Sequence, residues 1–104
     1  MSKSFVIRYQ MRPDTTDENK ALIQNVFAEL AAKRPEGLRY AAFRLEDGVT
    51  FVHVGTMPDE GSPLSDTEAF QEFGKAFGER VASEPDRSGA EVIGAYGFDH
   101  APEL

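Results

Sequence analysis

The chain has 104 residues, which is enough for one domain with a modest hydrophobic core. It contains no Cys, which excludes a disulfide framework and thiolate chemistry, and no apolar run approaches the roughly 18 residues of a membrane span. Its formal net charge is −7, from 11 basic and 18 acidic side chains, so we expect no nucleic-acid partner, because phosphates are bound mainly by basic surfaces. The N-terminus shows no signal-peptide pattern, and we expect a cytoplasmic protein without membrane attachment.

The first predicted strand runs from Ser4 to Met11. Its apolar face carries Phe5, Ile7, Tyr9 and Met11, which alternate with Val6, Arg8 and Gln10 on the other face. The segment 12–14 ends it, because its proline has no N–H to donate to a neighbouring strand. Thr15, followed three residues later by Glu18, forms a capping-box pattern that predicts a helix start. An apolar stripe at helical spacing follows, consisting of Leu22, Ile23, Val26, Phe27 and Leu30. It predicts an amphipathic helix that covers a sheet and ends before Pro35.

A β-hairpin is the clearest element of the chain. Asp47-Gly48 separates two β-rich runs, residues 38–46 and 49–57, and predicts a two-residue type I′ turn with positive φ at both positions. This turn would pair Ala42 with His53 and so fix the register. One face would carry Tyr40, Ala42, Arg44, Glu46, Val49, Phe51, His53 and Gly55, and the other Arg39, Ala41, Phe43, Leu45, Thr50, Val52, Val54 and Thr56. Both faces are apolar enough that the sequence does not decide which of them meets the helices.

A second helix is predicted after a loop over residues 58–65 that contains two prolines and a glycine. Ser65 and Glu68 repeat the capping-box pattern. The helix would bury an apolar stripe rich in phenylalanine, formed by Ala69, Phe70, Phe73, Ala76, Phe77 and Val81. Gly74 and Gly78 lie inside it, where they indicate either a close approach to a strand or space for a ligand.

The last predicted strand runs from Ala90 to Phe98 and follows a polar loop over residues 83–89. Residues 99–104 show no periodicity, so we expect a single domain over residues 1–98 and a loosely held tail. The element order is then β-α-β-β-α-β, which is the ferredoxin-like α+β fold with a four-stranded antiparallel sheet and both helices on one face.

Tyr40 and Phe51 are expected on the face of the sheet that the two helices leave uncovered. There they would form a larger apolar patch than monomers usually expose. We therefore expect a homodimer in which two sheets pack face to face and enclose a barrel-like core.

His53 is the first candidate for chemistry, because an imidazole exchanges protons near neutral pH. The alternative is a histidine with structural hydrogen bonds only. Arg44 and Tyr40 are candidates for orienting an anionic or oxygen-bearing substrate. The alternative for Arg44 is an ion pair at the end of the strand, and the alternative for Tyr40 is a hydroxyl that forms only a local hydrogen bond. An apolar substrate site, or simply the core, would be lined by Tyr9, Phe51, Phe73, Phe77 and Tyr96. The spacing of His and acidic residues indicates no metal site.

The stretch from Gly37 to Val54, the Pro63-Leu64 loop and the run from Ala69 to Phe73 resemble the antibiotic-biosynthesis-monooxygenase-like domains of the dimeric α/β-barrel superfamily. The resemblance covers nearly the whole chain. It implies a homodimer of ferredoxin-like subunits, and it implies oxygenation of a small aromatic or quinol-like substrate without any cofactor. In that reaction His53 would be the base, and Tyr40 and Arg44 would orient the substrate.

The alternative function is a non-catalytic homodimer that binds a small molecule or a protein. The oxygenases of the family use a Trp and an Asn near the substrate, and the haem-degrading members use a helix histidine as the iron ligand. This chain has no Trp, its asparagines Asn19 and Asn25 lie on the first predicted helix, and the second predicted helix has no histidine. These departures favour the non-catalytic alternative.

Overall fold

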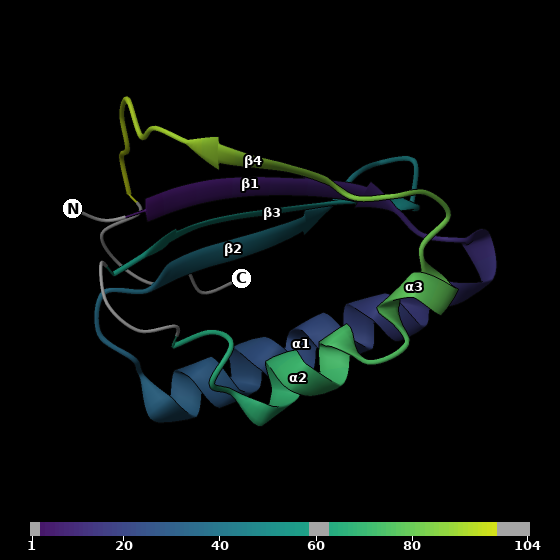
Figure 1. The fold of residues 1–104 in the computed structure, drawn as a ribbon, viewed down its shortest axis with the longest axis horizontal. Helices are drawn as coiled ribbons and strands as arrows, with labels where there is room; N and C mark the ends of the chain where they lie inside the picture. Colours follow the sequence, from purple (N-terminus) through teal and green to yellow (C-terminus); the bar gives the residue numbers. More distant parts are fainter. Residues whose placement is uncertain (1–2, 59–62, 98–104) are drawn as a thin grey trace.

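The computed structural model describes residues 3–58 and 63–97 and arranges them as a four-stranded antiparallel sheet with helices on one side (Figure 1). The sheet has the strand order β2-β3-β1-β4, with β1 (Lys3–Gln10), β2 (Arg39–Arg44), β3 (Thr50–Met57) and β4 (Asp86–Ala90). The helices are the 3-10 turn η1 (Pro13–Thr15), α1 (Thr16–Lys33), α2 (Glu68–Gly74) and α3 (Phe77–Arg80). The predicted ferredoxin-like α+β fold is confirmed. The predicted tail over residues 99–104 lies outside the described residues.

The β2–β3 hairpin has the predicted register, with Ala42 opposite His53. The predicted type I′ turn is wrong, because Gly48 has a positive φ of 79° and Asp47 does not. The amide of Gly48 donates to the carbonyl oxygen of Leu45 at 3.0 Å, and the Asp47 carboxylate accepts from the two amides that follow the turn at 3.0 and 2.9 Å. A four-residue loop thus replaces the two-residue loop. The register survives because adding one loop residue on each side leaves the same strand residues opposite each other.

The helices cover the face of the sheet that carries Tyr40, Phe51 and His53, so the prediction that Tyr40 and Phe51 lie on the uncovered face is wrong. Phe51 is only 2% exposed and stacks against Tyr9, with ring centroids 5.6 Å apart. Tyr40 stacks against Phe27 of α1 at 5.1 Å. The reason lies in β1: its more apolar face is the one that meets the helices, and the β1–β3 register places Phe51 and His53 on that same face.

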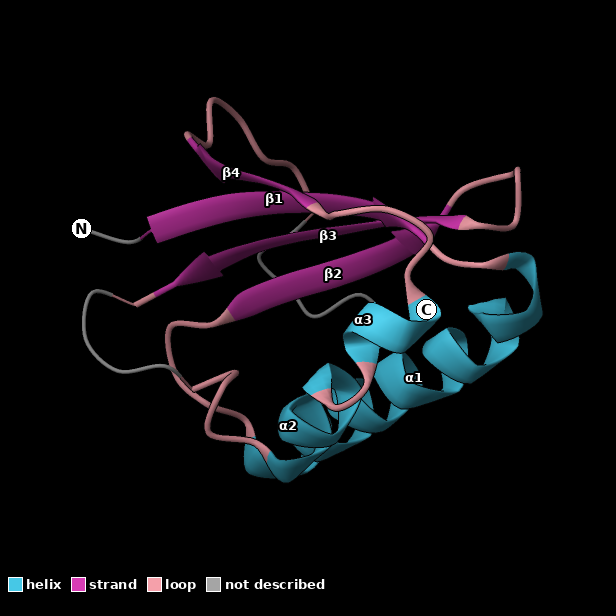
Figure 2. Cartoon of the chain, turned by 45° about the vertical axis from the view of Figure 1, so that its right-hand side comes forward, coloured by secondary structure: helices cyan, strands magenta, loops and turns pink. Residues whose placement is uncertain are grey.

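The opposite face of the sheet carries no helix in the described part of the chain (Figure 2). The register brings aliphatic and aromatic residues together there, with Val6 opposite Val54 and Phe43 opposite Val52. Val6 is 36% exposed and Phe43 is 45% exposed. We call this apolar surface, formed by Val6, Phe43, Val52 and Val54, the open face.

The last strand lies earlier in the chain than predicted. β4 falls within the segment predicted as a polar loop, and it pairs with β1, for example through Arg87 opposite Ile7. Residues 91–97 form no strand, so the prediction of a strand from residue 90 to 98 is wrong; Phe98 lies outside the described residues. Every residue of β4 is exposed, so this edge strand needs no apolar face. Apolar alternation therefore did not reveal it, and the apolar residues that follow remain exposed, with Ile93 at 93% and Tyr96 at 97%.

The second helix is broken in two. Ala76 has a left-handed backbone with φ of 56°, and it lies in the break between the end of α2 at Gly74 and the start of α3 at Phe77. A Cβ atom at Gly74 or Gly78 would meet no atom within 4 Å, so the predicted close approach of these glycines to a strand is wrong. The two glycines weaken the helix without any gain in packing, which is consistent with the break beside them.

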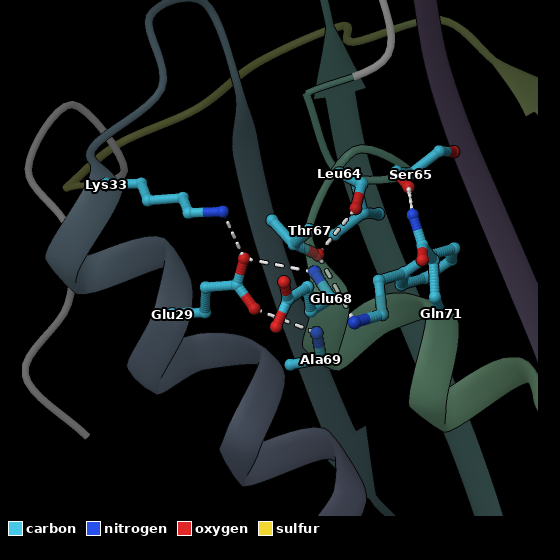
Figure 3. Close-up of polar contacts among 9 residues, drawn as sticks. Glu29, Lys33, Leu64, Ser65, Thr67, Glu68, Ala69 and Gln71 are labelled. Atoms are coloured by element: carbon cyan, nitrogen blue, oxygen red, sulfur yellow. Dashed lines mark hydrogen bonds and ion pairs between the residues drawn. The ribbon is translucent and has the colours of Figure 1, made fainter.

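The capping predictions are also corrected. The hydroxyl of Thr15 caps no amide and donates instead to the carbonyl oxygen of Arg80 at 2.9 Å. At α2 the cap is Thr67 rather than Ser65. Glu29 of α1 supplies the acidic partner, because its carboxylate accepts from the amides of Glu68 and Ala69 at 3.1 and 2.8 Å (Figure 3). Lys33 lies 2.6 Å from the same carboxylate, so one ion pair on α1 holds the start of α2.

Candidate functional site

Three strands bring two tyrosines and a histidine together on the helix-covered face. His53 lies on β3, directly opposite Ile7 of β1 and Ala42 of β2. Tyr9 and Tyr40 come from the diagonal positions on those two strands, and their phenol rings can reach the imidazole from both sides. The Oη atom of Tyr9 lies 2.7 Å from Nε2 of His53, and Oη of Tyr40 forms a hydrogen bond with Nδ1. Both ring nitrogens of His53 are therefore occupied.

A fourth polar residue, Asn19 of α1, extends this arrangement. Its Nδ2 atom donates to Oη of Tyr9 at 3.0 Å, and its side chain is fully buried. Its Oδ1 atom has no hydrogen-bond partner among the described residues. We call the four residues Asn19, Tyr9, His53 and Tyr40 the polar row.

Sequence reasoning missed the role of Asn19. The signal was its spacing: residues 19, 23 and 26 follow each other at intervals of four and three along the predicted helix, so Asn19 shares the buried face of Ile23 and Val26. A polar residue on the apolar stripe of a helix needs a partner in the core. The sequence could have indicated that Asn19 is buried, but not which residue it meets.

Burial keeps the polar row uncharged at neutral pH. Desolvation, assisted by the positive charge of Arg87, lowers the pKa of His53 to about 4. Desolvation raises the pKa of Tyr9 to about 12, although the hydrogen bond from Asn19 acts in the opposite direction. Desolvation also raises the pKa of Tyr40. The row is thus a series of neutral hydrogen-bond donors and acceptors.

Aromatic rings surround the polar row. Phe77 meets Tyr9 edge-on with ring centroids 5.0 Å apart, and Phe73 lies 5.8 Å from the ring of His53. The buried guanidinium of Arg80 lies over Phe73 at 5.6 Å and donates to its carbonyl oxygen at 2.6 Å. With Phe51 on the sheet side, these rings form an apolar shell around a small set of polar atoms, as is typical of small-molecule sites.

The structure brings together six of the eight residues that the sequence singled out, namely Tyr9, Tyr40, Phe51, His53, Phe73 and Phe77. Arg44 lies at the end of β2 and forms an exposed ion pair with Asp17, with Nη1 and Oδ1 3.2 Å apart. Tyr96 lies in the exposed segment after β4. Neither residue is in contact with the polar row.

Two surface hollows have been located, and neither is lined by His53. One, of about 280 Å³, lies at the edge between β1 and β4 and includes Tyr9 in its wall. The other, of about 330 Å³, lies between α1 and α2 and includes Glu29 and Glu72. Among residues 3–58 and 63–97 there is no group of three or more His, Cys, Asp or Glu that could hold a metal ion. No helix in the same two ranges is both long and apolar enough to cross a membrane.

Comparison with known proteins gives matches among solved structures. No sequence family and no curated protein matches the chain. Rv0793 from Mycobacterium tuberculosis superposes with a TM-score of 0.69 at 16% identity, over 91% of this chain and 98% of that chain. An antibiotic biosynthesis monooxygenase superposes with a TM-score of 0.68 at 16% identity, over 90% of this chain and 100% of that chain. A variant of SnoaB, a cofactor-independent oxygenase from Streptomyces nogalater, superposes with a TM-score of 0.65 at 15% identity. The match covers 92% of this chain and 97% of that chain.

The chain shares its fold with these solved structures, among them an antibiotic biosynthesis monooxygenase and the SnoaB variant. The resemblance found in the sequence is thereby confirmed at the level of the fold. At these sequence identities the structural similarity does not assign a role to any individual residue of this chain. In this fold the row lies between the sheet and the helices, and its half-buried end is Tyr40.

Proposed function

We propose that the protein is a cofactor-independent monooxygenase that acts on a small aromatic or quinol-like substrate at the polar row. The observation that carries this proposal is a neutral imidazole held between two phenols inside a shell of aromatic rings. The shared fold with SnoaB, which is described as a cofactor-independent oxygenase, supports it. A site of this composition favours a planar, apolar substrate with one or two oxygen atoms.

The reaction needs no external reductant. A quinol that has lost a proton can transfer one electron to O₂, and the resulting radical and superoxide combine to form a C–O bond at a ring carbon. Cleavage of the O–O bond then leaves one oxygen atom on the ring and releases the other as water. Both hydrogens of the water come from the quinol, which ends as a hydroxyquinone.

The protein has to lower the energy of the substrate anion, and the polar row offers two ways to do so. The imidazole of His53 could accept the proton through the hydroxyl of Tyr40. Alternatively, the hydroxyl of Tyr40 could donate a hydrogen bond to the anionic oxygen. Tyr40 takes part in both, because it is the end of the row and, unlike Tyr9 and His53, is only partly buried. Arg44 has its own ion pair with Asp17, and we leave it out of the proposed site.

Substrate entry requires part of the aromatic shell to move. Phe73 and Phe77 come from α2 and α3, which are only seven and four residues long. Ala76 between them has the left-handed backbone that non-glycine residues adopt only at a cost. We propose that this segment opens to admit the substrate, because short helices with a costly link are among the least stable parts of a fold.

We further propose that two copies of the chain associate through their open faces. Val6 and Phe43 are exposed on that face beside other apolar residues, and two such faces could cover each other around a two-fold axis. The second candidate function is that this homodimer is non-catalytic. It is favoured by the observation that both ring nitrogens of His53 already have partners within the chain.

Oxygen uptake tests the proposed activity. Purified protein is mixed with hydroquinone, a methylated hydroquinone or a naphthohydroquinone, and O₂ consumption and quinone absorbance are followed. We expect turnover of at least one quinol above the rate in buffer, and a large loss in His53→Gln and Tyr40→Phe. His100→Gln is the matched histidine control and should keep the rate. If no quinol is consumed faster than in buffer, the non-catalytic homodimer is the better description.

A further inference from the structure

We propose that Asn19 is a positioning residue that fixes the direction of the hydrogen bonds along the polar row, so that the hydroxyl of Tyr40 is left as a donor to a ligand oxygen. The direction of the row is a property of the protein alone. Its consequence for catalysis rests on the proposed function.

The amide of Asn19 can be oriented in two ways. As described, Nδ2 donates to Tyr9 and Oδ1 has no partner. In the reverse orientation Oδ1 would accept from Tyr9, and both hydrogens of Nδ2 would face the site where Oδ1 finds no partner. Buried N–H groups without partners are rarer in proteins than carbonyl oxygens without partners. Asn19 is therefore the donor in its contact with Tyr9.

This orientation determines where the proton of Tyr9 goes. The Tyr9 oxygen accepts from Asn19, and its single proton needs an acceptor, because the side chain is only 3% exposed. Nε2 of His53, at 2.7 Å, is the acceptor within reach. If Nε2 carried the imidazole proton instead, the proton of Tyr9 would be buried without a partner among the described residues.

The tautomer of His53 follows from this choice. A neutral imidazole has one N–H and one acceptor nitrogen, so an accepting Nε2 places the proton on Nδ1. Nδ1–H then donates to the oxygen of Tyr40. The proton of Tyr40 is the one left over, and Tyr40 is the half-buried member of the pair of tyrosines. The row thus leaves its unpaired proton on the tyrosine that is only partly buried.

A donor at the end of such a series favours an anionic ligand. Each hydrogen bond in the row polarises the next, which strengthens the donation by the final hydroxyl. A phenolate oxygen gains more from this donor than a neutral phenol does. The direction set by Asn19 therefore assigns stabilisation of the substrate anion to the polar row, and it removes proton abstraction by Nδ1 of His53. The ligand class is an aromatic compound with an acidic hydroxyl.

Nitrogen-15 NMR of the imidazole tests the direction, since two-bond correlations distinguish the two tautomers. The chain has two histidines, and His100→Gln identifies the signals of His53. At pH 7.5 we expect the Nδ1–H tautomer to exceed the other by roughly tenfold or more, because the reverse arrangement buries an unpaired hydroxyl proton. Asn19→Asp, when the carbon-13 shift of its carboxyl group shows that it is ionised, replaces the donor by a carboxylate that only accepts, and should reverse the tautomer. Asn25→Asp places the same charge on an exposed position of α1 and should not.

A wild-type protein with the proton on Nε2 would overturn the inference. So would a folded Asn19→Asp variant that keeps the wild-type tautomer. If that variant does not fold, the wild-type tautomer decides by itself. Binding of 4-nitrophenol gives a second readout: we expect its phenolate absorbance to rise on binding, with roughly tenfold weaker binding to Tyr40→Phe. The expected tautomer without oxygen uptake from any quinol would keep this inference and remove the proposed monooxygenase.

Discussion

The two faces of the sheet are made by alternate residues of the same strands, yet they differ in kind. The covered face combines aromatic rings with the three strand residues of the polar row, and Asn19 of α1 completes the row from the helix layer. The open face is aliphatic and aromatic, with Phe43 as its most exposed large side chain. A surface of the first kind specifies geometry, whereas one of the second kind requires only another apolar surface. The difference supports our two proposals, which place chemistry on the covered face and association on the open face.

The largest expected effect is a difference in the free energy of unfolding between substitutions on the two faces. Phe51 and Phe43 lie on adjacent strands, 2% and 45% exposed. Phe51→Ala should lower the free energy of unfolding by about 3–5 kcal/mol, because it leaves a cavity in the core. Phe43→Ala should cost far less, because the side chain is already partly hydrated. Urea denaturation at low protein concentration measures both, and equal losses would contradict the assignment of the faces.

The next effect concerns association. Sedimentation at micromolar concentration should show a dimer of the wild-type chain. Phe43→Asp should weaken the dimer on the order of 100-fold, because it places a charge within the proposed apolar interface. The control is Arg12→Asp, an exposed position beyond the end of β1. A wild-type monomer under these conditions would remove the proposed homodimer.

A smaller effect should come from the pH dependence of the covered face. His53 has a pKa of about 4 in the folded protein and about 6.5 when unfolded, so the unfolded chain binds more protons between these values. Stability is therefore full above about pH 7 and falls as the pH decreases towards 4. From pH 7.5 to 5 the loss should be about 2 kcal/mol.

Urea titrations at both pH values measure this loss. His53→Gln should flatten the dependence, and His100→Gln should keep it. Glu29 and Asp47 do not obscure the window, because hydrogen bonds lower the pKa of each carboxylate and their contributions are lost at more acidic pH. An unchanged slope in His53→Gln would show that another group titrates.

The smallest effect lies in the helix layer that closes the covered face. Thr67 caps α2 by accepting from the amide of Phe70 at 3.2 Å. Thr67→Ala should destabilise the protein by about 1 kcal/mol, as the loss of an N-cap usually does. Ser65→Ala is the matched control at the residue that the sequence pattern favoured, and it should have little effect. Thermal unfolding monitored by circular dichroism compares the two.

The sequence predicted most of the architecture and only part of the site. The alternation of apolar residues and the Asp47-Gly48 pair were sufficient to predict β1, the hairpin and the register of the hairpin, because both are local signals. Which face of the hairpin the helices cover is not determined by a local signal, because it depends on β1 presenting its apolar residues to α1. The contact of Asn19 with Tyr9 was likewise out of reach, since it joins a helix to a strand through side-chain geometry. Distance in the fold limited the prediction of the covered face and of the Asn19 contact, whereas the absence of apolar alternation concealed β4.

β4 has a consequence for the behaviour of the protein at high concentration. An edge strand can act as a template on which further chains add, and this is one route to fibrils. β4 offers only five exposed residues, Asp86–Ala90, and two of them are charged. A short, polar edge of this kind resists such growth. The composition that concealed β4 in the sequence is therefore the same property that should keep the sheet from extending across this edge into the next molecule.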